Sequence, residues 1–282
     1  MKRNKHIITL FLLIFGVLSS QDSSFREDLV FEENIISTDV DQAASVYAVD
    51  MDRDGDMDVL SAGQSGKIAW YENDGNEVFT EQFITTAHQA VSVYAEDING
   101  DGNMDVLVAT QNGIWSIIAW YENDGSESFT EIIISTSANS AYSVFAADVD
   151  SDGDMDVLSG SHDDLEWYEN DGNEMFIEQV ISTSGNYTTD IYAADIDGDG
   201  DMDVLATYFV DNMIVWYEND GSENFTDHII STDATGARSV TAADVDSDGD
   251  MDVLSASTTD NKIAWYENDG SESFTEIIIS TS

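Results

Sequence analysis

A nine-residue acidic segment occurs five times in this chain, and its residue types and spacing could bind a cation. The first copy runs from Asp50 to Asp58, with carboxylates at positions 1, 3, 5, 7 and 9 and Gly55 at position 6. Side chains at positions 1, 3 and 5 can point inward, and glycine at position 6 allows a sharp turn. The carbonyl of residue 7 adds an oxygen, and the carboxylate at position 9 can bind with both oxygens. This all-oxygen ligand set predicts calcium.

The five copies supply the candidate metal ligands, with one Ca²⁺ expected for each loop. Asparagine replaces aspartate at positions 3 and 7 of the second copy. Because asparagine offers a carbonyl oxygen without charge, we expect the second loop to be the weakest site. Extracellular modules of this kind bind calcium with dissociation constants on the order of 0.1–1 mM. The candidate ligands, loop by loop, are Asp50, Asp52, Asp54, Asp56 and Asp58; Asp97, Asn99, Asp101, Asn103 and Asp105; Asp148, Asp150, Asp152, Asp154 and Asp156; Asp195, Asp197, Asp199, Asp201 and Asp203; and Asp244, Asp246, Asp248, Asp250 and Asp252.

An EF-hand shares positions 1 to 7 of this pattern and must be excluded. It requires a glutamate at position 12 and flanking helices. Position 12 is Ser61 in the first copy and Val108 in the second, and the flanking residues are strand-like. An EF-hand is therefore excluded. Five copies in register, each between the same two apolar runs, also argue against solvated acidic turns.

Four short apolar runs in each repeat must position the loop. In the first repeat they are 45–49, 58–62, 67–71 and 78–84, all rich in β-branched and aromatic residues. An Asn-Asp-Gly segment between the third and fourth runs suits a tight hairpin turn. Four consecutive antiparallel strands in a period near 50 residues predict an all-β fold, a β-propeller of about five four-stranded blades.

The fourth-strand pattern occurs once more than the acidic loop. Its additional copy, residues 31–38, precedes the first complete repeat and predicts a spare outer strand. Two arrangements remain open. The chain forms a five-bladed ring with a redundant strand, or it forms part of a larger ring.

The N-terminal residues predict export. Residues 1–20 combine a basic start, a short apolar run and small residues at the end, as a secretory signal peptide does. We expect a short linker at 21–30 and a single β-propeller domain of five repeats at 31–282. The protein is then secreted or at the cell surface, and it contains no cysteine that could form a disulfide.

Charge limits the class of partner. The formal net charge is -50, and the basic residues beyond the N-terminal segment are few. Such a surface repels phosphate backbones and anionic lipids, so neither nucleic-acid binding nor direct membrane insertion is expected. Disorder is also disfavoured, because 42% of the residues are hydrophobic and they recur in register with the repeat.

A Trp-Tyr pair recurs in every repeat, beginning with Trp70-Tyr71. Aromatic faces can stack on sugars, but adjacent strand residues face opposite sides and a blade is covered on both. We therefore expect these pairs to pack between blades. Trp115 departs from the repeat and is the tryptophan expected to be exposed.

The sequence offers little for catalysis. His88, His162 and His228 lie at unrelated points of the repeat, without zinc-ligand spacing, and the chain has no nucleophile-elbow or phosphate-binding motif. His162, Asp163, Asp164 and Glu166 could form an acid–base cluster, but a solvated loop is the simpler interpretation. We expect a protein that is not an enzyme.

The loop Asp-x-Asp-x-Asp-Gly-x-x-Asp followed by Val-Leu, placed between strands, resembles the FG-GAP-like or VCBS repeats related to the calcium-binding blades of integrin α-subunits. The resemblance covers about residues 31–282. It implies a β-propeller with one calcium in each loop, used for adhesion or ligand recognition in secreted or surface proteins. The literal Phe-Gly and Gly-Ala-Pro signatures are absent, so integrin-like partner binding does not transfer.

The expected function is therefore a secreted calcium-binding module for adhesion or for an extracellular protein or glycan ligand. The alternatives are a carbohydrate-binding lectin, a catalytic or accessory part of a polysaccharide-degrading enzyme, and a purely architectural spacer.

Overall fold

The computed structural model describes residues 33–281. The predicted signal peptide, the linker and the first two residues of the predicted propeller domain lie outside this range. Within 33–281 the helical content is one 3₁₀ turn, η1 (Gly113–Trp115). No helix among these residues is long and apolar enough to cross a membrane.

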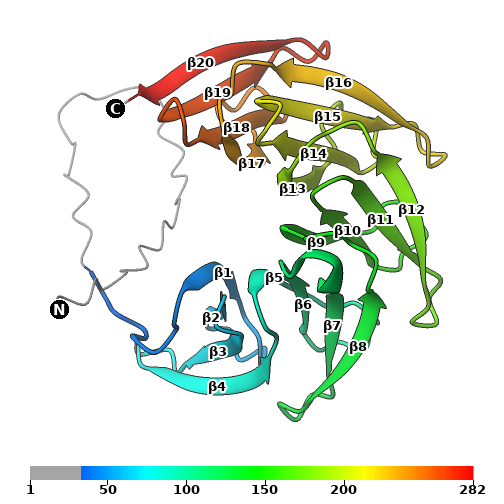
Figure 1. Cartoon of the computed structure of the whole chain (residues 1–282). Helices are drawn as coiled ribbons and strands as arrows, with labels where there is room; N and C mark the ends of the chain where they lie inside the picture. The colour runs from blue at the N-terminus through cyan, green and yellow to red at the C-terminus, as the bar shows by residue number, and fades with distance from the viewer. Residues whose placement is uncertain (1–32, 282) are drawn as a thin grey trace.

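The described residues form five four-stranded antiparallel sheets, the blades, each with its strands in chain order. Figure 1 shows the blades following one another around an arc. Blade one contains β1 (Ala43–Val49), β2 (Asp58–Gly63), β3 (Lys67–Asn73) and β4 (Phe79–Thr86); blade two contains β5 (Ala90–Glu96), β6 (Asp105–Thr110), β7 (Ile118–Asn123) and β8 (Phe129–Ser135); blade three contains β9 (Ser143–Ala147), β10 (Asp156–Gly160), β11 (Leu165–Asn170) and β12 (Phe176–Ser182); blade four contains β13 (Thr188–Ala194), β14 (Asp203–Tyr208), β15 (Met213–Asn219) and β16 (Phe225–Ser231); and blade five contains β17 (Ala237–Ala243), β18 (Asp252–Ser257), β19 (Lys262–Asn268) and β20 (Phe274–Thr281).

These strands confirm the predicted β-propeller architecture and the four runs of the first repeat. Each acidic loop joins the first strand of a blade to the second, and each Asn-Asp-Gly turn joins the third to the fourth. Because neighbouring strands are antiparallel, both connections lie at the same end of the blade, which we call the loop end. The connections between the second and third strands lie at the opposite end.

The predicted spare outer strand is wrong for the residues that the structure describes. Residues 33–38 form no strand. Instead Ile36 and Val40 pack against Val59, Ala69 and Tyr71, on the face of blade one that is turned away from blade two. The physical reason is that β4 and β20 already fill the fourth-strand positions of blades one and five, so no described blade lacks the strand that this pattern would supply.

The tryptophan–tyrosine pairs pack between blades as expected, except for Tyr71 and Trp265 at the two ends of the arc. Trp120 on β7 faces blade three, whereas Tyr121 faces blade one. Trp120, Trp167 and Trp216 each meet, edge to face, the phenylalanine that begins the fourth strand of the next blade. The ring centroids of Trp120 and Phe176, for example, are 6.2 Å apart. Four of these tryptophans are at most 1% exposed, namely Trp70, Trp120, Trp167 and Trp216.

Aromatic side chains also connect the inner strands. Ring centroids are 4.6 Å apart between Tyr47 and Tyr94, 4.6 Å between Tyr94 and Phe145, and 5.2 Å between Phe145 and Tyr192. This row runs from blade one to blade four along corresponding positions of β1, β5, β9 and β13. It holds the inner edges of successive blades at similar distances, so the blades form a regular arc.

The arc is open in Figure 1, where blades one and five are not neighbours. The face of blade five that is turned away from blade four therefore differs from the corresponding face of the other blades. Ile263 on β19 is 47% exposed, whereas its counterparts Ile68, Ile118 and Ile214 are fully buried. Trp265 is likewise only partly buried.

This difference predicts unequal costs for two equivalent substitutions. Trp216→Ala should lower the free energy of unfolding by about 3–5 kcal/mol, because it leaves a cavity between blades four and five. Trp265→Ala should cost clearly less, since one side of that ring has no packed blade. Urea unfolding followed by circular dichroism would measure both variants, and equal losses would contradict the unequal packing.

Candidate metal centres

Hydrogen bonds within each acidic loop curl the backbone around one point. In the first loop the Asp52 Oδ1 accepts the N–H of Asp54 at 3.1 Å, and the Asp54 Oδ1 accepts the N–H of Asp56 at 2.9 Å. The same two contacts recur in the other four loops. Gly55 at position 6 has a φ of 98°, a conformation that favours glycine. The curled backbone brings alternate side chains to the same side.

The carboxylate at position 9 is a buried structural link. Asp58 is 1% exposed, and its Oδ2 accepts the N–H of Met51 at 2.9 Å. Its Oδ1 accepts the N–H of Asn73 in the hairpin turn at 2.7 Å. Equivalent bonds occur in all five blades. This residue therefore joins the start of the loop to the β3–β4 turn of the same blade.

The hydrogen bonding of the carboxylate at position 1 shows whether a cation fits the loop. The Asp50 Oδ2 accepts the N–H of Gly55 at 3.0 Å. Its other oxygen is buried and has no hydrogen-bond donor, and the same holds for Oδ1 of Asp97 and Asp148. A buried carboxylate oxygen without a donor carries a large desolvation cost, which a bound cation would offset. The loops therefore fit a cation with oxygen ligands.

The structure brings many of the predicted ligands together. Carboxylate oxygens approach within 4.8 Å of one another in four of the loops. The groups are Asp50, Asp52 and Asp58; Asp148, Asp150 and Asp156; Asp195, Asp197 and Asp199; and Asp244, Asp246 and Asp248.

The side chains at position 7 point elsewhere. A Cβ added to Gly75 of the hairpin turn would collide with the Asp56 carboxylate, so this side chain lies against the turn. Asp154, Asp201 and Asp250 lie in the same way against their turns, as does the Asn103 amide in the second blade. Any contribution of position 7 to the metal would therefore come from its carbonyl group.

Burial raises the pKa of the carboxyl groups at position 9 in the first four loops. The pKa rises to about 7 for Asp105 and Asp156 and to about 6 for Asp203, although two backbone N–H donors oppose the rise in each case. Without a cation these groups bind a proton near neutral pH. Protons and a metal ion therefore compete for the same loops.

The second loop has a feature that the sequence did not reveal. Arg53, at position 4 of the first loop, lies with Nη2 3.6 Å from Oδ2 of Asp97, at position 1 of the second loop. Position 4 has positive φ in every loop, with 62° for Arg53 and 62° for Ser151. A fixed positive charge beside Asp97 opposes a second cation there. It adds a physical reason to expect that the second loop is the weakest site.

A recurring glutamate, which the loop pattern did not predict, lies beside position 3 of the acidic loops. Burial raises the pKa of Asp52, and repulsion by Asp54 and Glu72 adds to that rise, which places Glu72 beside position 3 of the loop. The side chain of Asn99 in the second loop donates to Glu122 at 3.4 Å. The available signal was the sequence Trp-Tyr-Glu-Asn, which occurs in every repeat.

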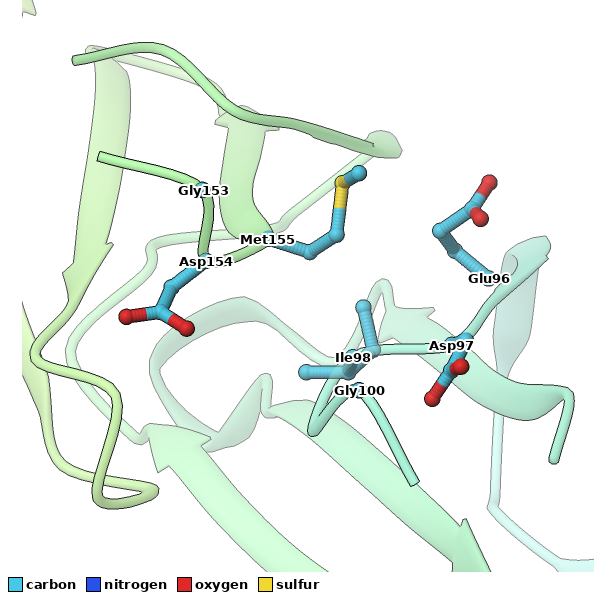
Figure 2. A pocket seen from close by; sticks show the side chains of 7 residues that line it. All are labelled: Glu96, Asp97, Ile98, Gly100, Gly153, Asp154 and Met155. Atoms are coloured by element: carbon cyan, nitrogen blue, oxygen red, sulfur yellow. The ribbon is translucent and has the colours of Figure 1, made fainter. Parts of the chain in front are cut away.

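A hollow of about 260 Å³ separates the second and third loops (Figure 2). Glu96, Asp97 and Ile98 lie on one side of it, with Asp154 and Met155 on the other. Carboxylates dominate its polar lining, so it disfavours anionic ligands. The loop end of the arc is accordingly an acidic surface.

The remaining candidate residues are at the opposite end. Trp115 is 75% exposed, as expected from its departure from the repeat. His162 and Asp163 are exposed, with the His162 Nδ1 2.7 Å from the Asp163 Oδ1, whereas Glu166 is buried and accepts a hydrogen bond from the Tyr168 hydroxyl at 2.7 Å. The proposed acid–base cluster is thus divided between a surface loop and the blade interior.

The blades, their turns and their acidic loops define a tandem-repeat β-propeller. The FG-GAP-like repeat model matches residues 50–108, 97–159, 148–206, 203–255 and 244–282. The chain belongs to the FG-GAP-like repeat family, which confirms the resemblance found in its loops. No curated protein matches the sequence of the chain.

Solved structures with low sequence identity share the fold. One is a lectin from Agrocybe aegerita, described as specifically recognising non-reducing terminal N-acetylglucosamine, with 16% identity and a TM-score of 0.59 over 85% of this chain and 67% of the lectin. A protein of unknown function from Desulfotomaculum acetoxidans has 11% identity and a TM-score of 0.59, over 84% of this chain and 69% of its own. BBS1N, solved in a complex with ARL6DN, has 12% identity and a TM-score of 0.54, over 78% of this chain and 64% of BBS1N. The similarity covers about two thirds of each of these chains.

The Arg53–Asp97 contact leads to a prediction about calcium affinity. Arg53→Ser should strengthen calcium binding at the second loop by about 1.5- to 5-fold, as expected for removing an exposed charge worth about 0.2–1 kcal/mol. Serine is compatible with the backbone, because Ser151 and Ser247 occupy position 4 elsewhere. The amide signal of Gly102 in a nuclear magnetic resonance titration would report this site. Arg238→Ser removes the same charge at the opposite end and should leave the Gly102 titration unchanged, whereas equal shifts in both variants would contradict the local explanation.

Proposed function

We propose that this protein is an exported, calcium-stabilised β-propeller that binds an extracellular ligand. The observation that carries the calcium part is the buried, unpartnered carboxylate oxygen at position 1 of three loops. A divalent cation in each loop would offset the desolvation of this oxygen and the repulsion among neighbouring carboxylates. The calcium ions would then be structural, holding the first two strands of every blade.

The end of the arc opposite the loops supports a role in ligand binding. The ring centroids are 4.4 Å apart for Tyr142 and Tyr187 and 5.9 Å apart for Tyr187 and Phe209. The Arg238 Cζ lies 4.7 Å from the centroid of the Phe209 ring. We call these four residues the aromatic row. It crosses blades three, four and five, and none of its side chains is fully buried. Amphipathic aromatic rings beside an arginine are typical of recognition surfaces.

A glycan is the ligand that this surface favours, with a protein ligand as the second candidate. Tyrosine and phenylalanine faces pack on apolar sugar faces, and tyrosine hydroxyls and nearby carboxylates supply polar partners. The fold shared with the Agrocybe aegerita lectin agrees with a carbohydrate ligand. The fold shared with BBS1N, which was solved in a complex, agrees with a protein ligand.

Binding without catalysis is the role that the residues favour. His162 is exposed and Glu166 is held inside blade three, so the carboxylates near this histidine do not converge on one open site. The net charge of -50 disfavours nucleic acids and anionic membranes as partners.

Thermal unfolding of the protein in about 2 mM calcium, magnesium or EGTA would test the calcium part. With five sites and dissociation constants of about 0.1–1 mM, calcium should add about 3–9 kcal/mol to the free energy of unfolding and raise Tm by roughly 10 °C or more. Magnesium should have little effect, because it prefers small octahedral sites. Identical melting temperatures in calcium and EGTA would leave the loops as acidic turns.

The calcium-dependent rise in Tm should also depend on pH. The raised pKa values of Asp105, Asp156 and Asp203 mean that the calcium-free folded protein holds protons more tightly than the unfolded chain does. Its stability therefore increases as pH falls through about 7 to 6, while calcium must displace those protons. The rise should be smaller at about pH 5.5 than at about pH 8, and a larger rise at the lower pH would contradict the competition.

Ligand binding would be tested on a glycan array with the calcium-loaded protein. Tyr187→Ala should weaken any glycan bound at the aromatic row by about tenfold, since it removes the central ring. Val78→Ala, an exposed apolar residue at the loop end, is the matched control and should leave binding unchanged. Absence of glycan binding by the folded protein, or equal effects of the two variants, would contradict a glycan site at the aromatic row.

A further inference from the structure

A cluster at the junction of blades four and five contains a histidine and two glutamates. His228 on β16 lies opposite Trp216 on β15, and Glu218 lies two residues further along the same face of β15. The His228 Nε2 is 2.7 Å from the Glu218 Oε2. The third residue is Glu272, in the β19–β20 turn of blade five. One possible ligand atom from each of the three residues lies within 4.8 Å of those from the other two.

The His228 imidazole is held in place before any ligand binds. Its ring stacks on Trp216, with centroids 4.5 Å apart and an angle of 27° between the planes. The His228 and Glu218 side chains are 33% and 29% exposed, so the cluster is reachable from solvent. A ring fixed by stacking loses little freedom on binding a cation.

The chemistry of these three groups differs from that of the acidic loops. One imidazole nitrogen and two carboxylate oxygens suit a zinc-class cation, which binds nitrogen at about 2.0–2.1 Å and oxygen at about 2.0–2.2 Å in tetrahedral geometry. Calcium takes six to eight oxygen ligands and gains little from an imidazole. A hollow of about 100 Å³ lies beside the cluster and is lined by Asp197, Asp250 and Glu272, whose charges favour a cation.

Comparison of the blade junctions shows what the histidine adds. At the position of His228, blades one and three carry glutamine, whose amides donate to the corresponding glutamates: Gln82 to Glu72 at 2.9 Å and Gln179 to Glu169 at 3.1 Å. Blades two and five carry isoleucine at this position and have no such hydrogen bond there. Histidine replaces the amide with a ring nitrogen, which can either make that contact or bind a metal.

We propose that His228, Glu218 and Glu272 bind a zinc-class transition-metal cation that joins blade four to blade five. These three residues are not among the loop ligands, but the hollow beside them is shared with Asp197 and Asp250 of the fourth and fifth loops. Three protein ligands leave the fourth tetrahedral position open for water or for an oxygen atom of a bound molecule. The blade junction would then have a metal-dependent link that the other junctions lack.

The test is zinc binding by isothermal titration calorimetry, with millimolar calcium present to occupy the acidic loops. The protein should bind one zinc ion in a way that His228→Gln weakens by about tenfold or more, because it removes the nitrogen ligand. The variant should fold, since it restores the residue of blades one and three, and its calcium-dependent melting provides the check. His162→Gln, which removes an exposed histidine, should leave this zinc ion bound.

A gain of binding tests the same geometry independently. Gln179→His places a histidine next to Glu169, with Glu223 in the turn of blade four, and should create a second zinc site. Cobalt should report the same sites through the visible absorption of tetrahedral Co²⁺. Equal zinc binding by the wild-type protein and His228→Gln would overturn the proposal and leave the His228–Glu218 contact as a hydrogen bond only.

Discussion

Each blade depends on one buried aspartate, the residue at position 9 of its acidic loop. Both carboxylate oxygens of Asp156 accept backbone N–H groups, one from Val149 in the loop and one from Asn170 in the hairpin turn. The side-chain amide of Asn170 donates a hydrogen bond to the backbone carbonyl of Ile98 in the preceding blade at 3.3 Å. Asp156 and Asn170 together therefore connect the acidic loop, the β11–β12 hairpin and the neighbouring blade. Its burial costs free energy, because a charged group leaves water, and charge-assisted hydrogen bonds offset that cost.

This arrangement explains why the two ends of the arc have different chemistry. The loop end collects the acidic repeats and their turns, so its hollows are lined by carboxylates, as between the second and third loops. The connections at the opposite end are more variable in length, and they include η1 and the segment around Phe209. A regular set of loops is suited to holding cations and stabilising the blades. Variable connections are suited to recognition, because they can change without disturbing the acidic loops.

The blade junctions share one backbone arrangement but not one set of side chains. Trp120, Trp167 and Trp216 each pack edge to face against a phenylalanine of the next blade at 6.2 to 6.4 Å. Because this packing is common to the junctions, other positions beside it are free to differ. Glutamine, isoleucine and histidine all occur at the position of His228. A repeat architecture can in this way acquire a new site at one junction without altering the others.

The sequence by itself determined the features that depend on neighbours in the chain. The strands, the hairpin turns and the curl of the acidic loops follow from residues within one period, and the exclusion of an EF-hand needs only position 12 and the flanking runs. The burial of the tryptophan–tyrosine pairs also follows, because alternate strand residues face opposite sides of a blade.

The tertiary structure alone decided which side chains from different blades meet. Arg53 reaches Asp97 in the next loop, the aromatic row collects residues from three blades, and Glu272 approaches His228 across a blade junction. Residues 33–38 form no strand although their sequence predicts one, because β4 and β20 already fill the fourth-strand positions of blades one and five. These contacts depend on the angle and distance between blades. That geometry is a property of the packed arc and of no single repeat.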